Sequence, residues 1–251
     1  QGAQKVGMGK DLYDQYPVAK ALIEQADKAL GESLSAVMFE GPGEELTRTC
    51  NCQPALYVHG LACLAVLKEL VPSLNPVAAA GLSLGEFTAH AAAGTYSFEE
   101  GLRLVQKRGA FMEEACNATK GTMAAMIGGT DENVIKLAQE CDVDVANFNC
   151  PGQTVVSGTE EGVAKAVAGA KAAGCKIAKK LNVAGAYHSR LMHSAMVKLA
   201  EELKNISFGT PSMPVYCNYE ARVVEGPDDI RSMLEHQVCG SVRWTASMQK
   251  L

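Results

Sequence analysis

A short apolar run that ends in a tight turn and passes directly into a helix constrains the fold more than any other feature of this sequence. Residues 76–83 (Pro-Val-Ala-Ala-Ala-Gly-Leu-Ser) are small and apolar at successive positions, which is typical of a strand covered on both faces. Residues 84–93 follow with a helical pattern that ends at Gly94. Because strand, turn and helix form the unit of an α/β fold, we expect a mostly parallel sheet.

Helical periodicity extends this unit along the chain. Apolar residues recur at spacings of three to five, and proline or glycine marks several ends. The pattern predicts helices at 54–70, 98–116, 189–204 and 227–238, with a further strand at 213–218.

The segment 122–183 has a different order of elements. It predicts, in turn, a strand, a helix, two strands, a helix and a strand, at 122–127, 131–141, 144–149, 153–158, 160–173 and 176–183. The order βαββαβ is typical of a ferredoxin-like subdomain. We therefore predict a large α/β domain formed by residues 1–120 and 185–251, with a small ferredoxin-like subdomain at 121–184 inserted in it.

Composition limits the classes of function. The 251 residues are 47% hydrophobic, which suits one substantial domain with a subdomain. A net charge of −5 without a dense Lys/Arg run argues against nucleic acid as a partner. We read no apolar stretch as approaching the roughly 20 residues that span a bilayer, so we expect no membrane.

The nine cysteines are scattered and odd in number. They are expected to be free thiols in a reducing compartment, which predicts a cytoplasmic protein, or one of an organelle stroma or matrix in a eukaryote. No leader precedes the first residues, and no metal-ligand spacing stands out, so no metal is expected.

The turn itself carries a candidate nucleophile. Residues 81–85 read Gly-Leu-Ser-Leu-Gly, the G-x-S-x-G pattern of an α/β-hydrolase-like nucleophile elbow, in which flanking glycines leave room for a strained serine. The helix that follows points its positive end at the same place, which suits a developing oxyanion. The alternative for Ser83 is an ordinary turn serine.

A serine hydroxyl needs a base, and five histidines are present. His59 and His90 lie within helical patterns and favour packing or surface roles. His193 lies on a helix and His236 near a helix end. His188 stands in a loop between a strand and a helix, which is a typical place for a catalytic base.

Arg108 lies on the predicted helix 98–116, in the tripeptide Lys-Arg-Gly. An arginine there is most simply a solvated surface residue. The functional alternative is a fork for a substrate carboxylate, because a guanidinium pairs with a carboxylate through two parallel hydrogen bonds.

The chain resembles malonyl-coenzyme A:acyl carrier protein transacylases and, more loosely, the acyltransferase domains of polyketide and fatty acid synthases. The resemblance covers nearly the whole chain in ordered elements. They are Gln1-Gly2-Ala3-Gln4 with Val6-Gly7-Met8-Gly9, Gln53-Pro54-Ala55, Gly81 to Phe87, Arg108-Gly109 with Met112, Asn147 to Gln153, His188 to Met192, and Val242-Arg243-Trp244.

The resemblance implies a role for each matching residue. Ser83 would be acylated, and His188 would activate it. The backbone carbonyl of Gln237 would orient the histidine in place of a carboxylate. Backbone amides of Gln1 and Leu84 would form the oxyanion hole.

The acyl pocket is implied in the same way. Arg108 would hold the malonyl carboxylate, with Gln53 beside it. Leu82 stands where the family usually has histidine, which alters a pocket wall. Tyr187 resembles the aromatic of malonyl-selective polyketide domains, where its bulk would exclude an α-methyl branch worth about 1–3 kcal/mol of discrimination.

The implied reaction moves malonyl from malonyl-CoA to an acyl carrier protein for fatty acid elongation, without cofactor, by a monomer. Both ends look cut relative to the family. Two other functions stay open: an acyl-thioester hydrolase or editing acyltransferase of a polyketide pathway on the same fold, and a non-catalytic carrier-binding module.

Overall fold

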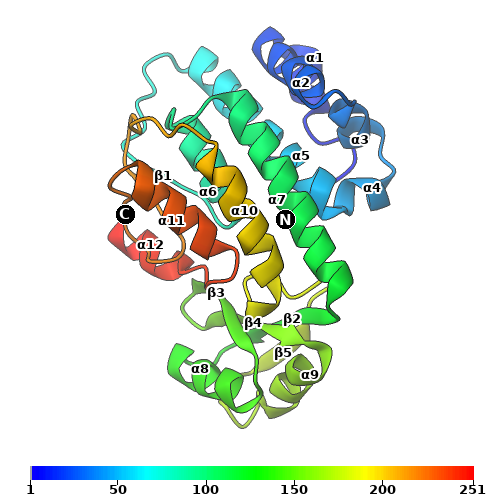
Figure 1. Ribbon diagram of the computed structural model, residues 1–251, viewed down its shortest axis with the longest axis vertical. Helices are drawn as coiled ribbons and strands as arrows, with labels where there is room; N and C mark the ends of the chain where they lie inside the picture. Colours follow the sequence, from blue (N-terminus) through cyan, green and yellow to red (C-terminus); the bar gives the residue numbers. More distant parts are fainter. Residues whose placement is uncertain (1) are drawn as a thin grey trace. The chain divides into compact units, whose positions relative to one another are not determined.

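The computed structural model of the protein describes residues 2–251 and divides the chain into two compact units (Figure 1). The first contains the residues up to Ala110 together with Asn205–Val215, and the second contains Phe111–Lys204 together with Tyr216–Leu251. Helix α7 (Phe98–Ala118) and strand β6 (Val215–Tyr216) each contribute to both units.

Helices dominate the first unit. They are α1 (Lys10–Gln15), α2 (Pro17–Leu30), α3 (Leu34–Glu40), α4 (Gly43–Thr47), α5 (Thr49–Leu70), α6 (Leu84–Ala92) and the first part of α7. The long α5 packs against α2, α3, α4 and α6. Its core positions include Cys52, Ala55, Tyr57, Val58 and Ala62, all of which are fully buried.

Helix α5 also has the length and composition of a membrane span, and no other helix of residues 2–251 does. Of its apolar window 44% is buried, and the core helix of a soluble protein passes the same test of length and composition. Helix α5 therefore contradicts the expectation that no stretch of this chain is long and apolar enough to span a bilayer. By itself α5 is weak evidence for a membrane.

The strand that precedes Ser83 is shorter than the sequence predicts. Strand β1 contains only Ala79–Ala80, whereas the apolar run covers 76–83. It forms a two-stranded sheet with β6, and Ala79 N donates to Pro214 O at 2.8 Å. Backbone pairing defines a strand, so an apolar run alone overestimates its length wherever the partner is short.

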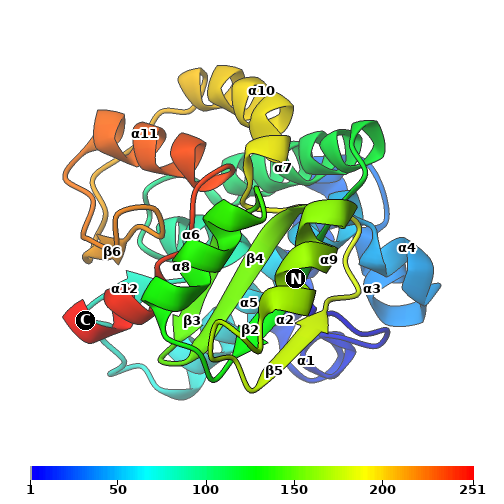
Figure 2. The ribbon, with the colours of Figure 1, turned by 90° about the horizontal axis from the view of Figure 1, so that it is seen from below.

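The second unit contains the predicted βαββαβ order. Its elements follow in the order β2 (Gly121–Ile127), α8 (Asp131–Glu140), β3 (Asp144–Cys150), β4 (Gln153–Thr159), α9 (Glu160–Gly169) and β5 (Ile177–Lys180). The sheet order is β3-β4-β2-β5, and every pairing is antiparallel. The two helices lie over one face of this sheet (Figure 2). The ferredoxin-like prediction is confirmed.

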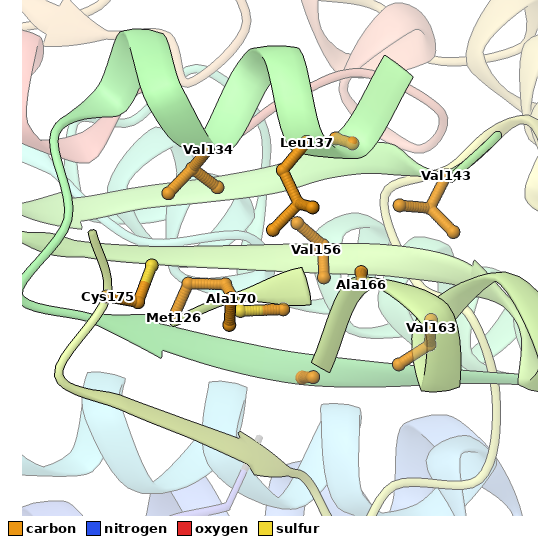
Figure 3. Close-up of a cluster of buried hydrophobic side chains, with 11 residues drawn as sticks. Met126, Val134, Leu137, Val143, Val156, Val163, Ala166, Ala170 and Cys175 are labelled. Atoms are coloured by element: carbon orange, nitrogen blue, oxygen red, sulfur yellow. The ribbon is translucent and has the colours of Figure 1, made fainter. Parts of the chain in front are cut away.

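Apolar side chains between that sheet and its helices form a core (Figure 3). Val134 and Leu137 reach down from α8, Val163 from α9, and Met126 and Val156 rise from the strands. Thr130 and Thr159 are the N-cap residues of the two helices. Their hydroxyls accept hydrogen bonds from the backbone amides of Asn133 and Gly162. These caps are the expected signals of helix starts.

The last part of the chain belongs with the same sheet. Helices α10 (His193–Lys204) and α11 (Pro227–Gln237) pack side by side (Figure 1), and α12 (Trp244–Lys250) follows. Val242 N donates to Ala146 O of β3 at 2.8 Å, and Phe148 N donates back to Val242 O at 2.9 Å. Because of these bonds the compact unit extends beyond 121–184. The predicted domain boundaries remain a prediction.

One prediction concerns the core of the second unit. Replacing Leu137 by alanine removes a side chain that is 7% exposed and packed into the core, so we expect the free energy of unfolding to fall by about 2–4 kcal/mol. Ile135→Ala, on the same helix but 36% exposed, should cost less than about 1 kcal/mol. Urea unfolding followed by circular dichroism measures both, and equal losses would contradict this packing.

The first unit contains a buried histidine on α6. His90 is fully buried, and its Nδ1 lies 3.1 Å from the Thr95 hydroxyl. Beside it, the Tyr96 hydroxyl donates to the Phe87 carbonyl at 2.6 Å. Burial disfavours the charged imidazolium and lowers the pKa of His90 to about 4. The folded protein therefore keeps His90 neutral.

The second prediction follows from that pKa. Unfolded His90 takes up its proton near pH 6.5, whereas the folded form does so near pH 4. The unfolded state therefore binds more protons between these values, and stability falls as the pH drops through this window, by about 3 kcal/mol. His90→Leu should flatten this part of the profile of stability against pH, while His193→Leu, at an exposed position, should not. An unchanged profile in His90→Leu would contradict the assignment.

Candidate active site

Ser83 occupies a strained turn between β1 and α6. Its backbone has φ 54° and ψ −108°, a conformation that side-chain-bearing residues rarely adopt. A Cβ on Gly81 would lie 2.0 Å from the carbonyl group of Gly85, so only glycine fits at position 81. A Cβ on Gly85 would meet nothing. The backbone at Gly81 thus lies close to the backbone at Gly85, and this forms the tight turn that the G-x-S-x-G pattern predicts.

Arg108 is buried beside Ser83 rather than solvated. It is 1% exposed, its Nη1 donates to Gln53 Oε1 at 2.6 Å, and its Nη2 donates to Ser83 Oγ at 3.1 Å. Its guanidinium carbon lies 5.0 Å from the ring centre of Phe87. Helices α5, α6 and α7 thus hold one cation against the serine hydroxyl. The surface alternative for Arg108 is wrong.

This cation has a chemical consequence. Burying a charge costs free energy unless hydrogen bonds or an opposite charge compensate for the lost hydration, so a buried arginine usually has a specific role. Two of the hydrogen bonds of this guanidinium go to the Gln53 side-chain amide and to the Ser83 hydroxyl. Such a site suits an anionic group that reaches within a few ångströms of the serine oxygen. The serine oxygen accepts the bond from Arg108, so its own hydrogen is not used in it.

Leu84 is the first residue of α6, where a backbone amide has no acceptor within the helix. The positive end of the α6 dipole therefore lies at Ser83, the residue that precedes the helix. Gln1, the other predicted oxyanion donor, lies outside the described residues. Leu82 is 41% exposed and lines an open groove of about 510 Å³ together with parts of α5, α6 and β1.

The second unit holds His188 in an equally unusual conformation. Its φ is 55°, and the side chain is 4% exposed. Its Nδ1 lies 2.9 Å from the backbone carbonyl of Gln237, at the end of α11. A carbonyl only accepts, so Nδ1 carries the hydrogen and Nε2 of the neutral ring is the basic nitrogen.

Two further contacts fix the loop around His188. The Ser189 hydroxyl donates to Ala186 O at 2.6 Å and accepts from Leu191 N at 3.2 Å. Arg190 donates to both carboxylate oxygens of Asp144 on β3, through Nε and Nη2. Sequence reasoning missed the link between Arg190 and Asp144, because neither residue belongs to a pattern and they lie far apart in sequence.

The structure therefore places the predicted residues in two groups. In the first unit Ser83, Arg108 and Gln53 contact one another directly. In the second unit His188 and Gln237 do so, with Tyr187 next in the chain and 7% exposed. Two other histidines have different surroundings: His193 is exposed, and His236 Nδ1 donates to the Ser232 backbone oxygen at 2.7 Å.

Comparison with known proteins identifies the family of this chain. The model of the acyl transferase domain family matches residues 1–250. The malonyl CoA-acyl carrier protein transacylase of Bacillus subtilis is 43% identical over 256 residues, covering 100% of this chain and 80% of that protein.

Solved structures give the same result. The malonyl CoA-acyl carrier protein transacylase of Coxiella burnetii has a TM-score of 0.96 and 35% identity, over 100% of this chain and 80% of that one. A malonyl-transacylase solved with its type II polyketide acyl-carrier protein has a TM-score of 0.95 and 37% identity, over 100% and 82%. The nucleophile turn, the buried arginine and the full-length similarity together show that the chain belongs to the acyl transferase domain family, among the malonyl CoA-acyl carrier protein transacylases.

Proposed function

We propose that this protein transfers malonyl from malonyl-CoA to the phosphopantetheine thiol of an acyl carrier protein, through a malonyl ester on Ser83. The observation that carries the proposal is the buried guanidinium of Arg108, 3.1 Å from Ser83 Oγ. The relatives named above as malonyl CoA-acyl carrier protein transacylases support the same substrate pair.

The position of Arg108 selects the acyl group. In malonyl, one methylene separates the carboxylate from the thioester carbonyl. A guanidinium next to the nucleophile can therefore bind the carboxylate while the carbonyl carbon lies at Ser83 Oγ. Gln53 keeps the guanidinium in place by accepting from Nη1. An acetyl group has nothing to offer this cation, so it gains no such orientation.

His188 is the proposed general base. Its Nδ1–H bond to the Gln237 carbonyl leaves Nε2 to take the serine proton, and the carbonyl stabilises the imidazolium that forms. A backbone carbonyl thus does the orienting work that a carboxylate does in many serine enzymes.

The reaction then has two halves. His188 takes the Ser83 proton, Oγ attacks the thioester carbon, the C–S bond breaks, and coenzyme A leaves with the proton from His188. The carrier thiol next gives its proton to His188, and its sulfur attacks the malonyl ester. The C–O bond breaks, and Ser83 Oγ takes the proton from His188 to restore the hydroxyl. The amides of Leu84 and Gln1 are the proposed donors to the oxyanion in both halves.

The wider setting belongs to the same proposal. A thioester is already activated, so the reaction requires neither a metal nor a redox cofactor. We place the enzyme in the cytoplasm, or in the stroma or matrix of a eukaryotic organelle, as a monomer that supplies malonyl units for fatty acid elongation. Tyr187 beside His188, and Leu82 at the turn, are the proposed pocket walls.

The third prediction tests the nucleophile. Brief exposure to malonyl-CoA should add the mass of one malonyl group to the wild-type protein and none to Ser83→Ala, because only Oγ forms the ester. Ser73→Ala, at an exposed position on the same unit, serves as the control and should be labelled like wild type. A malonyl adduct that persists on Ser83→Ala would refute the assignment.

The same assay separates the alternatives. With malonyl-CoA alone, a transferase holds the adduct and releases it only when carrier protein is added. Rapid release without carrier would identify a hydrolase. Absence of any adduct would favour a non-catalytic carrier-binding module.

The fourth prediction tests Arg108. Arg108→Ala should lower kcat/KM for malonyl-CoA by about 10–100-fold, the loss of roughly 1.5–3 kcal/mol of charge-assisted bonding, and should raise the relative use of acetyl-CoA. Arg103→Ala, exposed on the same helix, is the matched control and should leave both values unchanged. An unaltered preference for malonyl over acetyl in Arg108→Ala would overturn the carboxylate role.

A further inference from the structure

The hydrogen bond between His188 Nδ1 and the Gln237 carbonyl joins two segments that lie 49 positions apart in the sequence. One segment is a loop and the other is the end of helix α11, so neither sets the separation of 2.9 Å by itself. The backbone of His188 also has a φ of 55°, which residues with a side chain rarely adopt unless their surroundings hold them there. The geometry of the base therefore depends on what holds each segment.

Asp144, the first residue of strand β3, holds the loop that follows His188. Its carboxylate accepts from the backbone amide of Arg190 at 2.8 Å, and from Nε and Nη2 of the same arginine at 3.1 and 2.8 Å. Exposed ion pairs usually contribute little, and the Arg190 side chain is 59% exposed. Here, however, one carboxylate binds both the main chain and the guanidinium of one residue, which fixes orientation as well as distance.

The same strand holds the segment that follows Gln237. Ser241 Oγ donates to the Val145 carbonyl at 2.6 Å, and Val242 forms two backbone hydrogen bonds with β3. Ser241 lies only four positions after Gln237. Residues 144–148 of one strand therefore contact both the loop of the base and the segment next to its carbonyl partner.

Strand β3 is suited to this role because its own position is fixed. It pairs with β4 from Asp144, opposite Ser157, to Cys150, opposite Gln153, and helix α8 packs against it. Neighbouring residues of a strand lie about 3.3 Å apart along its axis. Because Asp144 and Val145 are consecutive, the strand sets the spacing between the two segments that it holds.

We propose that β3 positions the general base, with Asp144 and Ser241 as positioning residues on the two sides of the bond between His188 and Gln237. The inference rests on the proposed function, because it assigns these residues to the acylation of Ser83. Asp144 acts through the loop, and Ser241 acts through the main chain that follows the carbonyl. Neither residue belongs to the motifs on which the family resemblance depends.

The experiment measures single-turnover acylation of the intact chain over a range of malonyl-CoA concentrations, which separates the rate constant from the affinity for malonyl-CoA. Asp144→Ala should lower the rate constant by about tenfold, because a displaced base slows proton transfer. Ser241→Ala should lower it by about two- to threefold, since the backbone bonds of Val242 remain. Affinity should stay unchanged in both variants, because Arg108 and Gln53 are not altered.

Further variants show whether the carboxylate acts through Arg190. Arg190→Ala should slow acylation less than Asp144→Ala does, because the bond from the backbone amide at position 190 remains. The double variant Asp144→Ala/Arg190→Ala should be no slower than Asp144→Ala alone, since both changes act on one contact. Asp144→Glu, which keeps a carboxylate, should recover part of the loss.

NMR of the imidazole rings reports the position of the base without any substrate. The Nδ1–H proton of His188 is buried and bonded to the Gln237 carbonyl, so it should give a resonance that His188→Ala removes. This resonance should broaden or disappear in Asp144→Ala. Glu114→Ala is the matched control, because it removes two short bonds from the Lys198 ammonium group in the same unit. It should keep both the resonance and the acylation rate.

A wild-type rate constant and an unchanged resonance in Asp144→Ala would overturn the positioning role. Losses that multiply in the double variant, or a loss confined to the affinity for malonyl-CoA, would also overturn it. Equal slowing in Glu114→Ala would show general destabilisation instead of positioning. If the wild-type protein forms no malonyl adduct, the proposed function itself fails, whereas the His188 resonance still tests what β3 does to the imidazole.

Discussion

The hydrogen bond from Arg108 to Ser83 is the interaction on which the rest of the site depends. It joins a cation from α7 to a hydroxyl at the start of α6, and Gln53 of α5 holds the other end of the guanidinium. The three helices must therefore pack correctly before Ser83 is surrounded by these contacts. The strained backbone of Ser83 is tolerated because this packing, together with the close approach of Gly81 to Gly85, leaves no alternative position.

Local sequence patterns predict the elements well. The order of strands and helices from β2 to β5 follows from alternation, glycine and proline positions and threonine caps, all of which act over a few residues. The strand before Ser83 is one exception, and the strand predicted at 213–218, which forms only at Val215–Tyr216, is another. The length of each depends on a partner more than a hundred positions away rather than on its own apolarity. Pairing, unlike periodicity, cannot be read from one segment.

The chemistry of the site was less accessible to local reasoning. The burial of Arg108 depends on Gln53, 55 positions earlier, and helix 98–116 alone predicts a solvated arginine. The carbonyl partner of His188 lies 49 positions later and has no side-chain signature at all. Family resemblance proposed both pairs from ordered motifs, and the geometry then gave each a physical basis.

The pairing of Val242 with β3 has a consequence for how the small sheet meets other molecules. A sheet normally ends in strands with unused backbone groups, which can recruit a strand from a second copy. Here the segment at Val242 covers one such edge through bonds to Ala146 and Phe148. The opposite edge is β5, only four residues long and ending in Lys179 and Lys180, and charge and shortness both resist edge-to-edge growth. The two edges of the sheet are thereby protected from aggregation in different ways. A segment of the same chain pairs with β3, and the short length and lysine charges of β5 disfavour pairing with another strand.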